Sequence, residues 1–378
     1  MEIIQSEIIK TGENYLAWNI NKLSKSEFWN LSSNKKRYKY LASLAHLAPN
    51  SHNTQPWLFK YNSENDSVVV YIETARVLPA SDIVGRQAVI SLGCALANFE
   101  VAADSLDCVV VKNILLSEVK ISNQSAALIK IAEISIQKTE DTDTRHNENL
   151  KLYNAIFTRR VDRGEYDHDR KLDADLIKKI ESLGCYLNVK TILISDWGRK
   201  VALAELQAQA DSFVVNNKKF ANELVNDWML ENDSGLGLGM PGDTFRLNDE
   251  QTKRIKFRFR DDLGFESDDA ISIAQLGKKG ILSCQCVGML VIEKDEPTQW
   301  LNAGIILGKG ALMFESEGIA WAVHAGLAEV PQLNMMMLRP IAMTTKKPVI
   351  LFRAGYLKRN ETRAPHSPRM LFEKVWRE

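Results

Sequence analysis

Two long apolar segments, one in each half of the chain, constrain the fold most. Residues 85–106 read GRQAVISLGCALANFEVAADSL and residues 300–326 read WLNAGIILGKGALMFESEGIAWAVHAG, and each pattern predicts one long buried helix. Setting Gly93 against Gly304 without gaps brings together three further pairs: Leu96 with Leu307, Ser105 with Ser316, and the helix end at Asp107 with Gly318. Identity between the segments is low, but their hydrophobicity agrees, and this similarity indicates an internal duplication.

The shorter elements recur in the same order around these helices. In the first half we expect a helix at 40–48, strands at 57–61 and 67–72, and a buried strand at 108–116. After the polar stretch 138–150, we expect a helix at 172–184 and strands at 188–195 and 282–293. The sequence therefore predicts an α+β chain of two halves, residues 1–150 and 151–378, with two antiparallel or mixed sheets and surrounding helices.

Composition limits the partners and the compartment. Lys+Arg and Asp+Glu both number 48, so no long-range positive field would attract nucleic acid or an anionic membrane, and a small molecule is the expected partner. The five scattered cysteines are typical of a reducing compartment. The N-terminus MEIIQSEIIK lacks the pattern of a signal peptide, and no apolar run reaches the ~18 residues of a membrane span. We therefore expect a cytoplasmic protein.

An insertion interrupts the second half at about residues 226–270. It contains the glycine-rich stretch GLGLGMPGD, which follows no buried strand and lacks the GK[ST] of a phosphate loop, so a flexible turn is the preferred interpretation. Long segments without regular structure are usually lids, binding loops or disordered insertions. The sequence therefore predicts a lid or a loop here.

Two polar motifs are candidates for a binding site. The first is the loop in residues 48–61, APNSHNTQPWLFKY, and the second is FTRRVDRGEYD at 157–167, with Arg159, Arg160 and Arg163 close together. Guanidinium groups this close repel one another unless they are solvated or face an anion, and phosphate matches their paired donors. The alternative is a solvated basic turn whose arginines pair with nearby carboxylates, namely Asp162, Glu165 and Asp167. His52 has no G-x-S-x-G serine to activate, so hydrolase chemistry is not expected.

Taken together, the loop, the RRVDR motif and the two glycine-bearing helices resemble the nitroreductase family of flavin proteins. The loop is similar to the family's A-P-S-x-x-N-x-Q-P-W stretch, and RRVDR is similar to its RR-S-x-R motif. The order of the motifs, and the segment LPASDIVGRQAVISLGCALANFEVAA, resemble the Acg-type branch, in which one chain carries two nitroreductase-like halves. The resemblance implies an FMN site of the kind that lies between the subunits of a nitroreductase dimer. Here it would lie between the halves of a monomeric pseudo-dimer, with the loop from the first half and the arginines from the second.

The resemblance also assigns residues to this site. It places Arg159, Arg160 and Arg163 near the FMN phosphate and ring edge, and it places Arg369 of the C-terminal arm at the phosphate. The ring would be lined by four loop residues, Pro49, Asn50, Ser51 and Asn53, and Gly326 would offer its backbone N–H to the flavin N5 side. Two positions depart from the family pattern. Val161 stands where a serine or threonine is usual, and Asn50 stands where the first serine of the loop is usual.

The family resemblance leaves three functions open. The first is an FMN oxidoreductase that takes electrons from NADH or NADPH and passes them to nitro, quinone or similar acceptors in a ping-pong cycle, with no side chain needed as acid or base. The second is a flavin-sequestering protein in which the insertion closes over FMN and limits turnover. The third is a structural descendant that binds no flavin.

Overall fold

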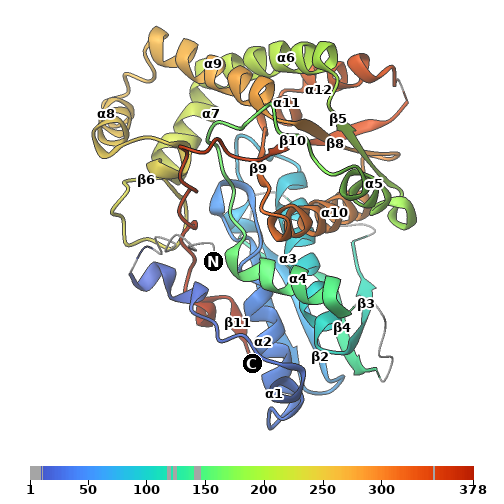
Figure 1. Cartoon of the computed structure of the whole chain (residues 1–378). Coiled ribbons are helices and arrows are strands. Elements are labelled where there is room, and N and C mark those ends of the chain that lie inside the picture. The colour runs from blue at the N-terminus through green and yellow to red at the C-terminus, as the bar shows by residue number, and fades with distance from the viewer. Residues whose placement is uncertain (1–9, 11, 117–120, 122–125, 140–145, 344) are drawn as a thin grey trace.

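Two separate β-sheets enclose a central pair of helices in the computed structural model (Figure 1). The structure describes residues 10, 12–116, 121, 126–139, 146–343 and 345–378. The first ten residues and the polar stretch 138–150, both used in the sequence analysis, lie largely outside the described residues. The α+β class is confirmed, with most strands antiparallel and helices packed around both sheets.

The first sheet has the strand order β11-β1-β2-β4-β3. Its strands are β1 (Trp57–Asn62), β2 (Ser67–Glu73), β3 (Cys108–Ile114), β4 (Leu128–Lys138) and β11 (Trp376–Arg377). The first four pair antiparallel in a continuous series, and β11 joins β1 in parallel. The last residues of the chain therefore complete the sheet of the first half.

The second sheet has the strand order β5-β8-β10-β9, and each neighbouring pair is antiparallel. Its strands are β5 (Val189–Ile194), β8 (Cys286–Ile292), β9 (Ala320–Val323) and β10 (Lys347–Gly355). Counted along the chain within each half, β1 to β4 of the first sheet and these four strands share the spatial order first, second, fourth, third. In both halves a 20-residue helix joins the second strand to the third: α3 (Arg86–Ser105) and α10 (Pro297–Ser316).

The helices α3 and α10 cross at two glycines. A Cβ atom built on Gly93 would lie 2.7 Å from the Cα of Gly304, and one built on Gly304 would lie 2.9 Å from the Cα of Gly93. Both helices are largely buried, and one hydrophobic cluster contains residues of both halves. The α3 segment is long and apolar enough to span a membrane, contrary to the sequence prediction, but 89% of it is buried inside the protein. Core packing accounts for its composition.

The remaining helices of the first part surround this core. They are η1 (Glu13–Trp18), α1 (Lys25–Trp29), α2 (Asn34–Ala45), η2 (Ser51–Asn53), η3 (Thr74–Arg76), α4 (His146–Thr158), α5 (Ala174–Ser182) and η4 (Cys185–Leu187). The expected boundary between residues 150 and 151 falls inside α4, which packs against both α3 and α10. The two halves therefore share a helix at this boundary rather than meeting at a linker.

The insertion is longer and more ordered than the sequence predicts. Between β5 and β8 the chain forms α6 (Trp197–Asn216), α7 (Lys218–Asn222), the π-helical turn η5 (Glu223–Trp228), β6 (Met229–Leu230), β7 (Met240–Pro241), η6 (Gly242–Phe245), α8 (Asp249–Arg260) and α9 (Ser267–Ser283). Part of it has a small core of its own, formed by Ala221, Val225, Met229, Ile255 and Phe259. These few apolar residues come from short elements, which give a weak periodic signal in the sequence.

Two further sequence predictions are corrected. The apolar run 300–326 is not one helix, because α10 ends near Gly318, whose φ of 67° is left-handed, and β9 follows. The strand at 108–116 is not buried: β3 is an edge strand, and Val109 and Val111 are each 49% exposed. The C-terminal part continues through α11 (Gly326–Glu329), α12 (Pro331–Asn334), η7 (Met335–Ile341) and η8 (Phe372–Lys374).

Candidate functional site

The loop after α2 has a strained backbone. His52, Asn53 and Gln55 have φ values of 46°, 55° and 47°, a left-handed conformation that residues other than glycine seldom adopt. Asn50 stabilises the turn, since its Oδ1 accepts the Gln55 N–H at 2.8 Å and its Nδ2 donates to the Ala48 carbonyl at 3.1 Å. Such strain persists where surrounding contacts hold it, and it is typical of binding sites. It therefore supports the choice of this loop as a candidate site.

Helix α3 holds the middle of the loop. The Ser51 N–H donates to Ser91 Oγ at 3.0 Å, and Ser51 Oγ donates to Gln87 Oε1 at 2.5 Å. Both partners lie in the first two turns of α3. The described hydrogen bonds of the predicted residues Asn50 and Ser51 are therefore made within the loop and to helix α3.

Arg369 of the C-terminal arm lies beneath the loop, fully buried. Its Nε and Nη2 donate to the carbonyls of residues 46–48 at 3.0–3.1 Å, and its Nη1 donates to Asn53 Oδ1 at 2.7 Å and to the Pro368 carbonyl at 2.9 Å. Every nitrogen of the guanidinium therefore has a protein acceptor. The sequence predicts a phosphate contact for Arg369, whereas the structure gives it the role of holding the loop.

Arg159 and Arg160 are also buried, at 2% and 5% exposure. Arg159 Nη2 donates to the Leu47 carbonyl at 2.7 Å, and Arg160 Nη1 donates to the Ala364 carbonyl at 3.2 Å. Arg159 Nε is buried without a hydrogen-bond partner among the described residues. Burial lowers the pKa of Arg159 to about 10, although Glu315 opposes that shift. His366 lies beside these two arginines, and we call Arg159, Arg160 and His366 the inner cluster.

Arg163 points to a second place. Its Nη1 donates to the Thr244 carbonyl at 3.0 Å, and its guanidinium lies 4.9 Å from the Phe245 ring. His52, His324 and Arg353 are close enough for their charges to interact with that of Arg163. Burial and Arg163 lower the pKa of His52 to about 4, and burial followed by Arg353 and Arg163 lowers the pKa of His324. We call Arg163, Arg353, His52 and His324 the outer cluster.

The outer cluster has unused polar atoms. In the part of the chain that the structure describes, His52 Nδ1, His324 Nε2 and Arg353 Nε are buried without hydrogen-bond partners. Buried polar atoms are normally satisfied, so atoms of this kind are candidate contacts for a ligand group. Because the cluster is cationic, an anion or an electron-rich ring edge would fit it.

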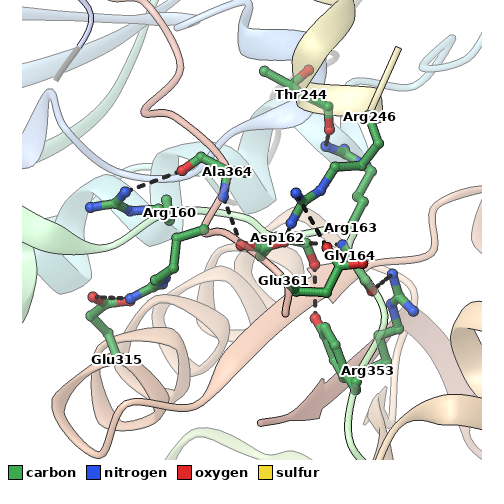
Figure 2. A network of polar contacts seen from close by, with 12 residues as sticks. Arg160, Asp162, Arg163, Gly164, Thr244, Arg246, Glu315, Arg353, Glu361 and Ala364 are labelled. Atoms are coloured by element: carbon green, nitrogen blue, oxygen red, sulfur yellow. Dashed lines mark hydrogen bonds and ion pairs between the residues drawn. The ribbon is translucent and has the colours of Figure 1, made fainter. Parts of the chain in front are cut away.

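Asp162 pairs with an arginine of the insertion (Figure 2). It is fully buried, and its carboxylate pairs with Arg246 of the insertion and accepts the N–H groups of Gly164 at 3.0 Å and Ala364 at 2.8 Å. Glu165 pairs with two lysines instead, Lys279 and Lys358. Arg159 and Arg160 are 2% and 5% exposed, so this segment is not the solvated turn of the alternative interpretation.

The glycine-rich stretch of the insertion packs directly against the loop. Asn53 Nδ2 donates to the Gly239 carbonyl at 2.9 Å, and Gln55 Nε2 donates to the Gly237 carbonyl at 2.7 Å. A Cβ on Gly237 would lie 2.5 Å from the carbonyl oxygen of Arg369. The flexible turn predicted from the sequence is thus a closely packed strap, and its glycines allow the approach of the backbone.

Gly326 begins α11, two residues after His324, and it packs against α6. A Cβ there would lie 3.1 Å from Asp211 Oδ1 and 3.3 Å from Gln207 Nε2. Pro49 and Asn53 lie in the loop itself, and Asn53 is buried. The structure therefore groups Gly326 with His324, and Arg159 with Arg160. It also separates Arg163 from Arg159 and Arg160, although all three lie in the RRVDR segment.

Three buried carboxylates link the insertion to α11. Glu223 accepts the N–H groups of Ala80 and Ser81, Asp82 accepts those of Gln87 and Ala88, and Glu329 is buried beside both carboxylates. Burial, with Asp82 and Glu223 nearby, raises the pKa of Glu329 to about 8. Burial also raises the pKa of Asp82 to about 7. At neutral pH this group therefore holds protons that the unfolded chain would release.

A stability measurement against pH would test this group. The Glu329 carboxyl binds more protons in the folded protein than in the unfolded chain between pH 4.5 and about 8, so its contribution to the free energy of unfolding should fall as pH rises through that range. Glu329→Gln should remove much of this fall, and at pH 8.5 it should be more stable than the parent by about 2 kcal/mol. Exposed Glu373→Gln is the matched control. Parallel urea-melt profiles of the parent and Glu329→Gln from pH 5.5 to 8.5 would contradict the assignment.

Four residues of the two clusters were not assigned to the site by the sequence analysis. His52 was considered only as a partner for a nucleophile, and His324, Arg353 and His366 belong to no local motif. They come from β10, the C-terminal arm and the segment after β9. The rarity of histidine in the chain would have been a useful signal. Four of its six histidines lie at or next to this loop, and one of them is His46, whose carbonyl accepts a hydrogen bond from Arg369.

Comparisons with known proteins give a local match to curated sequences. No family model matches the chain. A 64-residue stretch is 39% identical to the putative NAD(P)H nitroreductase acg of Mycobacterium tuberculosis, over 17% of this chain and 19% of that protein. An uncharacterized protein of the same organism is 41% identical over 61 residues, 16% of this chain and 18% of that protein. The chain thus matches less than a fifth of the length of these relatives.

Solved structures are similar over more of the chain at lower identity. The FMN-dependent nitroreductase NfnB from Mycobacterium smegmatis, solved with NADPH, is 16% identical with a TM-score of 0.39, over 61% of this chain and 98% of that chain. A nitroreductase with bound FMN from Bacteroides fragilis is 12% identical with a TM-score of 0.34, over 56% of this chain and 90% of that chain.

An α+β chain with a strained A-P-N-S-H-N loop between an arginine-bearing arm and an RRVDR segment is of the nitroreductase type. The local sequence match makes the relationship more specific. The chain is a distant homologue of the Acg protein, and the resemblance inferred from its motifs is confirmed.

Proposed function

We propose that the chain is an FMN-dependent oxidoreductase of the nitroreductase type, which takes electrons from NADH or NADPH and reduces nitro, quinone or similar acceptors. The observation that carries the proposal is the pair of cationic clusters along one strained loop. The inner cluster lies beside Leu47 of the loop, and the outer cluster includes His52 of the loop. A molecule with a phosphate at one end and an electron-rich ring edge at the other would satisfy both clusters and their unused polar atoms.

The residues of this chain would bind and orient the cofactor. The inner cluster would hold the phosphate, and Arg163 with the outer cluster would face the polar edge of the ring. Arg369 and Asn53 keep the loop in its strained form, so they would act by positioning Pro49, Asn50 and Ser51. FMN supplies hydride and single-electron chemistry when it is bound, and the insertion would exclude water from it.

A flavin-sequestering function is the second candidate, and the contacts of the insertion favour it. The insertion reaches the loop through Gly237 and Gly239, and it reaches the second half through Arg246 and Thr244. A segment that covers both parts of the site would limit the access of a stacking substrate.

Bleaching of the bound flavin separates these functions. The oxidoreductase should lose flavin absorbance on addition of NADH or NADPH under anaerobic conditions, and nitrofurazone or menadione should restore it. Tightly bound FMN that neither donor bleaches would exclude the oxidoreductase and favour sequestration. Purified protein that takes up no FMN in a titration would exclude both functions.

We also infer that the two halves are diverged copies of one unit. The shared strand order supports this, and so does the contact of Gly93 with Gly304, because equivalent residues meet at a two-fold axis. Asp107 and Gly318, paired by the same alignment, both end their helices with left-handed φ values of 59° and 67°.

Equivalent side chains also support the duplication. Ser91 and Asn302 lie two residues before the paired glycines, and each binds the helix-to-strand loop of its own half, through the N–H of Ser51 and the carbonyl of Leu187 respectively. One chain would then supply both sides of the site, and we propose a cytoplasmic monomer. Light scattering should give about 43 kDa, in agreement with the 42.7 kDa of the chain.

Replacement of Arg159 tests the phosphate end of the site. Arg159→Met should weaken FMN binding by about 1.5–3 kcal/mol, the range for hydrogen bonds to charged groups, because Arg159 is buried with an unused Nε. Riboflavin, which lacks the phosphate, should bind both proteins with equal affinity. Fluorescence titrations with each flavin measure this, and a thermal melt checks folding. An equal loss for FMN and riboflavin would move the phosphate away from Arg159.

A further inference from the structure

His366 occupies an unusual place in the C-terminal arm. Its side chain is nearly buried, with the residue 6% exposed, and its ring packs on that of Trp18 with centroids 4.2 Å apart. Trp18 is itself held by the arm, because its Nε1 donates to the Ser367 carbonyl at 2.9 Å. The imidazole is therefore fixed in position by packing on one side and by the arm on the other.

The two nitrogens of this ring differ in their surroundings. The ring hydrogen-bonds to the backbone of Thr158, one residue before Arg159. Nε2 is buried, and it has no hydrogen-bond partner among the residues that the structure describes. Polar atoms in such positions are normally paired, so Nε2 is a candidate contact for a group that the protein chain does not supply.

The charges around His366 are unbalanced. Arg159 and Arg160 of the RRVDR segment and Arg369 of the arm all act on the imidazole. Of the acidic groups of this region, Glu315 pairs in a bidentate manner with Arg363 at 2.8–2.9 Å, and Asp162 pairs with Arg246 and accepts the Ala364 N–H. The other titratable group near Arg369 is Tyr15, whose pKa is raised by burial. Burial and the arginines lower the pKa of His366 to about 3, so the free protein holds a neutral imidazole at neutral pH.

We propose that His366 is a phosphate-binding residue and that phosphate binding at Nε2 is coupled to the uptake of one proton. The proposal rests on the proposed function, because the phosphate is that of FMN. The nearby arginines repel a proton on the imidazole, whereas a phosphate dianion next to the ring attracts it. The imidazolium that forms then donates Nε2–H to a phosphate oxygen. The proton comes from solvent. FMN can also bind as a phosphate monoanion that donates its own proton to Nε2. The monoanion took that proton from solvent, so the net uptake is again one proton.

The coupling predicts a particular pH dependence. The second pKa of a phosphate monoester is about 6, so above pH 7 the free flavin is a dianion and free His366 is neutral. Binding then takes up one proton, and the dissociation constant for FMN should rise by up to tenfold per pH unit. Arg159, which acts on the imidazole, stays charged in this range, since its pKa is about 10. Riboflavin should show no such dependence.

Titrations of FMN and riboflavin at pH 7.0, 7.5, 8.0 and 8.5 test the proposal. For the parent protein we expect FMN binding to weaken about tenfold between pH 7 and 8, with riboflavin constant within twofold. His366→Gln keeps a neutral hydrogen-bonding group, and its affinity for FMN should stay constant within twofold over the same range. Exposed His168→Gln is the matched control and should behave as the parent protein does.

Proton uptake gives a second measurement that needs no variant. Calorimetric titration of the parent protein with FMN at pH 7.5, in two buffers of different ionisation enthalpy, should report about one proton taken up per FMN and none per riboflavin. FMN binding with no proton uptake, or with the same pH slope in His366→Gln as in the parent, would overturn the proposal and leave the oxidoreductase function standing. Failure of the parent protein to bind FMN would overturn both.

Discussion

Gly93→Ala should lower the free energy of unfolding by about 3 kcal/mol or more, because the added methyl group has no space in the crossing of α3 and α10. Its Cβ would lie 2.7 Å from the Gly304 Cα and 2.8 Å from the Ile305 nitrogen, and both are backbone atoms that cannot rotate away. The helices would have to move apart, and the core between the two halves would lose contacts. Chemical denaturation followed by circular dichroism measures the effect.

The other helix of the crossing, α10, offers a control of opposite sign. Gly310 also lies inside α10, but no atom lies within 4 Å of a Cβ built there. Gly310→Ala should therefore raise the free energy of unfolding by about 0.5–1 kcal/mol through helix propensity and reduced entropy of the unfolded chain. Equal effects of the two substitutions would show that the helices do not cross at Gly93.

Arg369→Met should have an effect of similar size for an electrostatic reason. Removal of the guanidinium leaves the His46 carbonyl and Asn53 Oδ1 without the donor that Arg369 supplies, whereas the carbonyls of Leu47 and Ala48 keep other donors. Each buried group left unpaired costs about 1–3 kcal/mol. Because some groups will find water, we expect a total loss of about 3–5 kcal/mol. FMN should bind weakly at best, since the loop that carries Pro49 to Asn53 would relax.

Comparison with an exposed arginine isolates this role. Arg359→Met lies in the same C-terminal region on the surface, and it should change stability by less than about 0.5 kcal/mol. Riboflavin distinguishes a holding role from a phosphate contact. If Arg369 holds the loop, Arg369→Met loses affinity for riboflavin as well as FMN; a loss for FMN alone, with stability unchanged, would restore the phosphate contact predicted from the sequence.

The C-terminal arm is the element that most clearly joins the halves. It begins after β10 of the second sheet, passes Asp162 through Ala364, and places Arg369 under the loop of the first half. It then ends as β11, paired with β1. The site and the first sheet are therefore both completed by residues that lie more than 300 positions from the loop in the sequence.

Most of the regular elements of both sheets could be predicted from the sequence. The patterns of 57–62, 67–73 and 189–194 are short runs of β-branched and aromatic residues, and those of 86–105 and 297–316 are long apolar helices, so local propensity and burial agree. The end of α10 was missed because Ile319 to Val323 continue its apolar run, and only the left-handed Gly318 breaks it. Within the insertion, α7 and α8 were missed because their apolar residues are few.

The site, like the fold, has parts that could be predicted from the sequence and parts that could not. The loop and the RRVDR segment are contiguous motifs, and their residue types alone indicated a candidate anion site. The directions of Arg159 and Arg163 could not be predicted, because the segment that holds them is neither helix nor strand and has no regular side-chain period. What lies on each side of it is set by the fold. His324, Arg353 and His366 join the two clusters from separate elements, and no sequence spacing links them.

The sequence by itself determined the class of the chain, the position of its two central helices and the two candidate binding motifs, because these follow from local patterns of burial and charge. Only the tertiary structure decided which arginines remain available and which hold the protein together. Arg369 carries the same charge as Arg159, but it lies under a turn whose carbonyls already use its donors. The function of a buried charged group depends on the partners within hydrogen-bond reach, and those are brought together by folding.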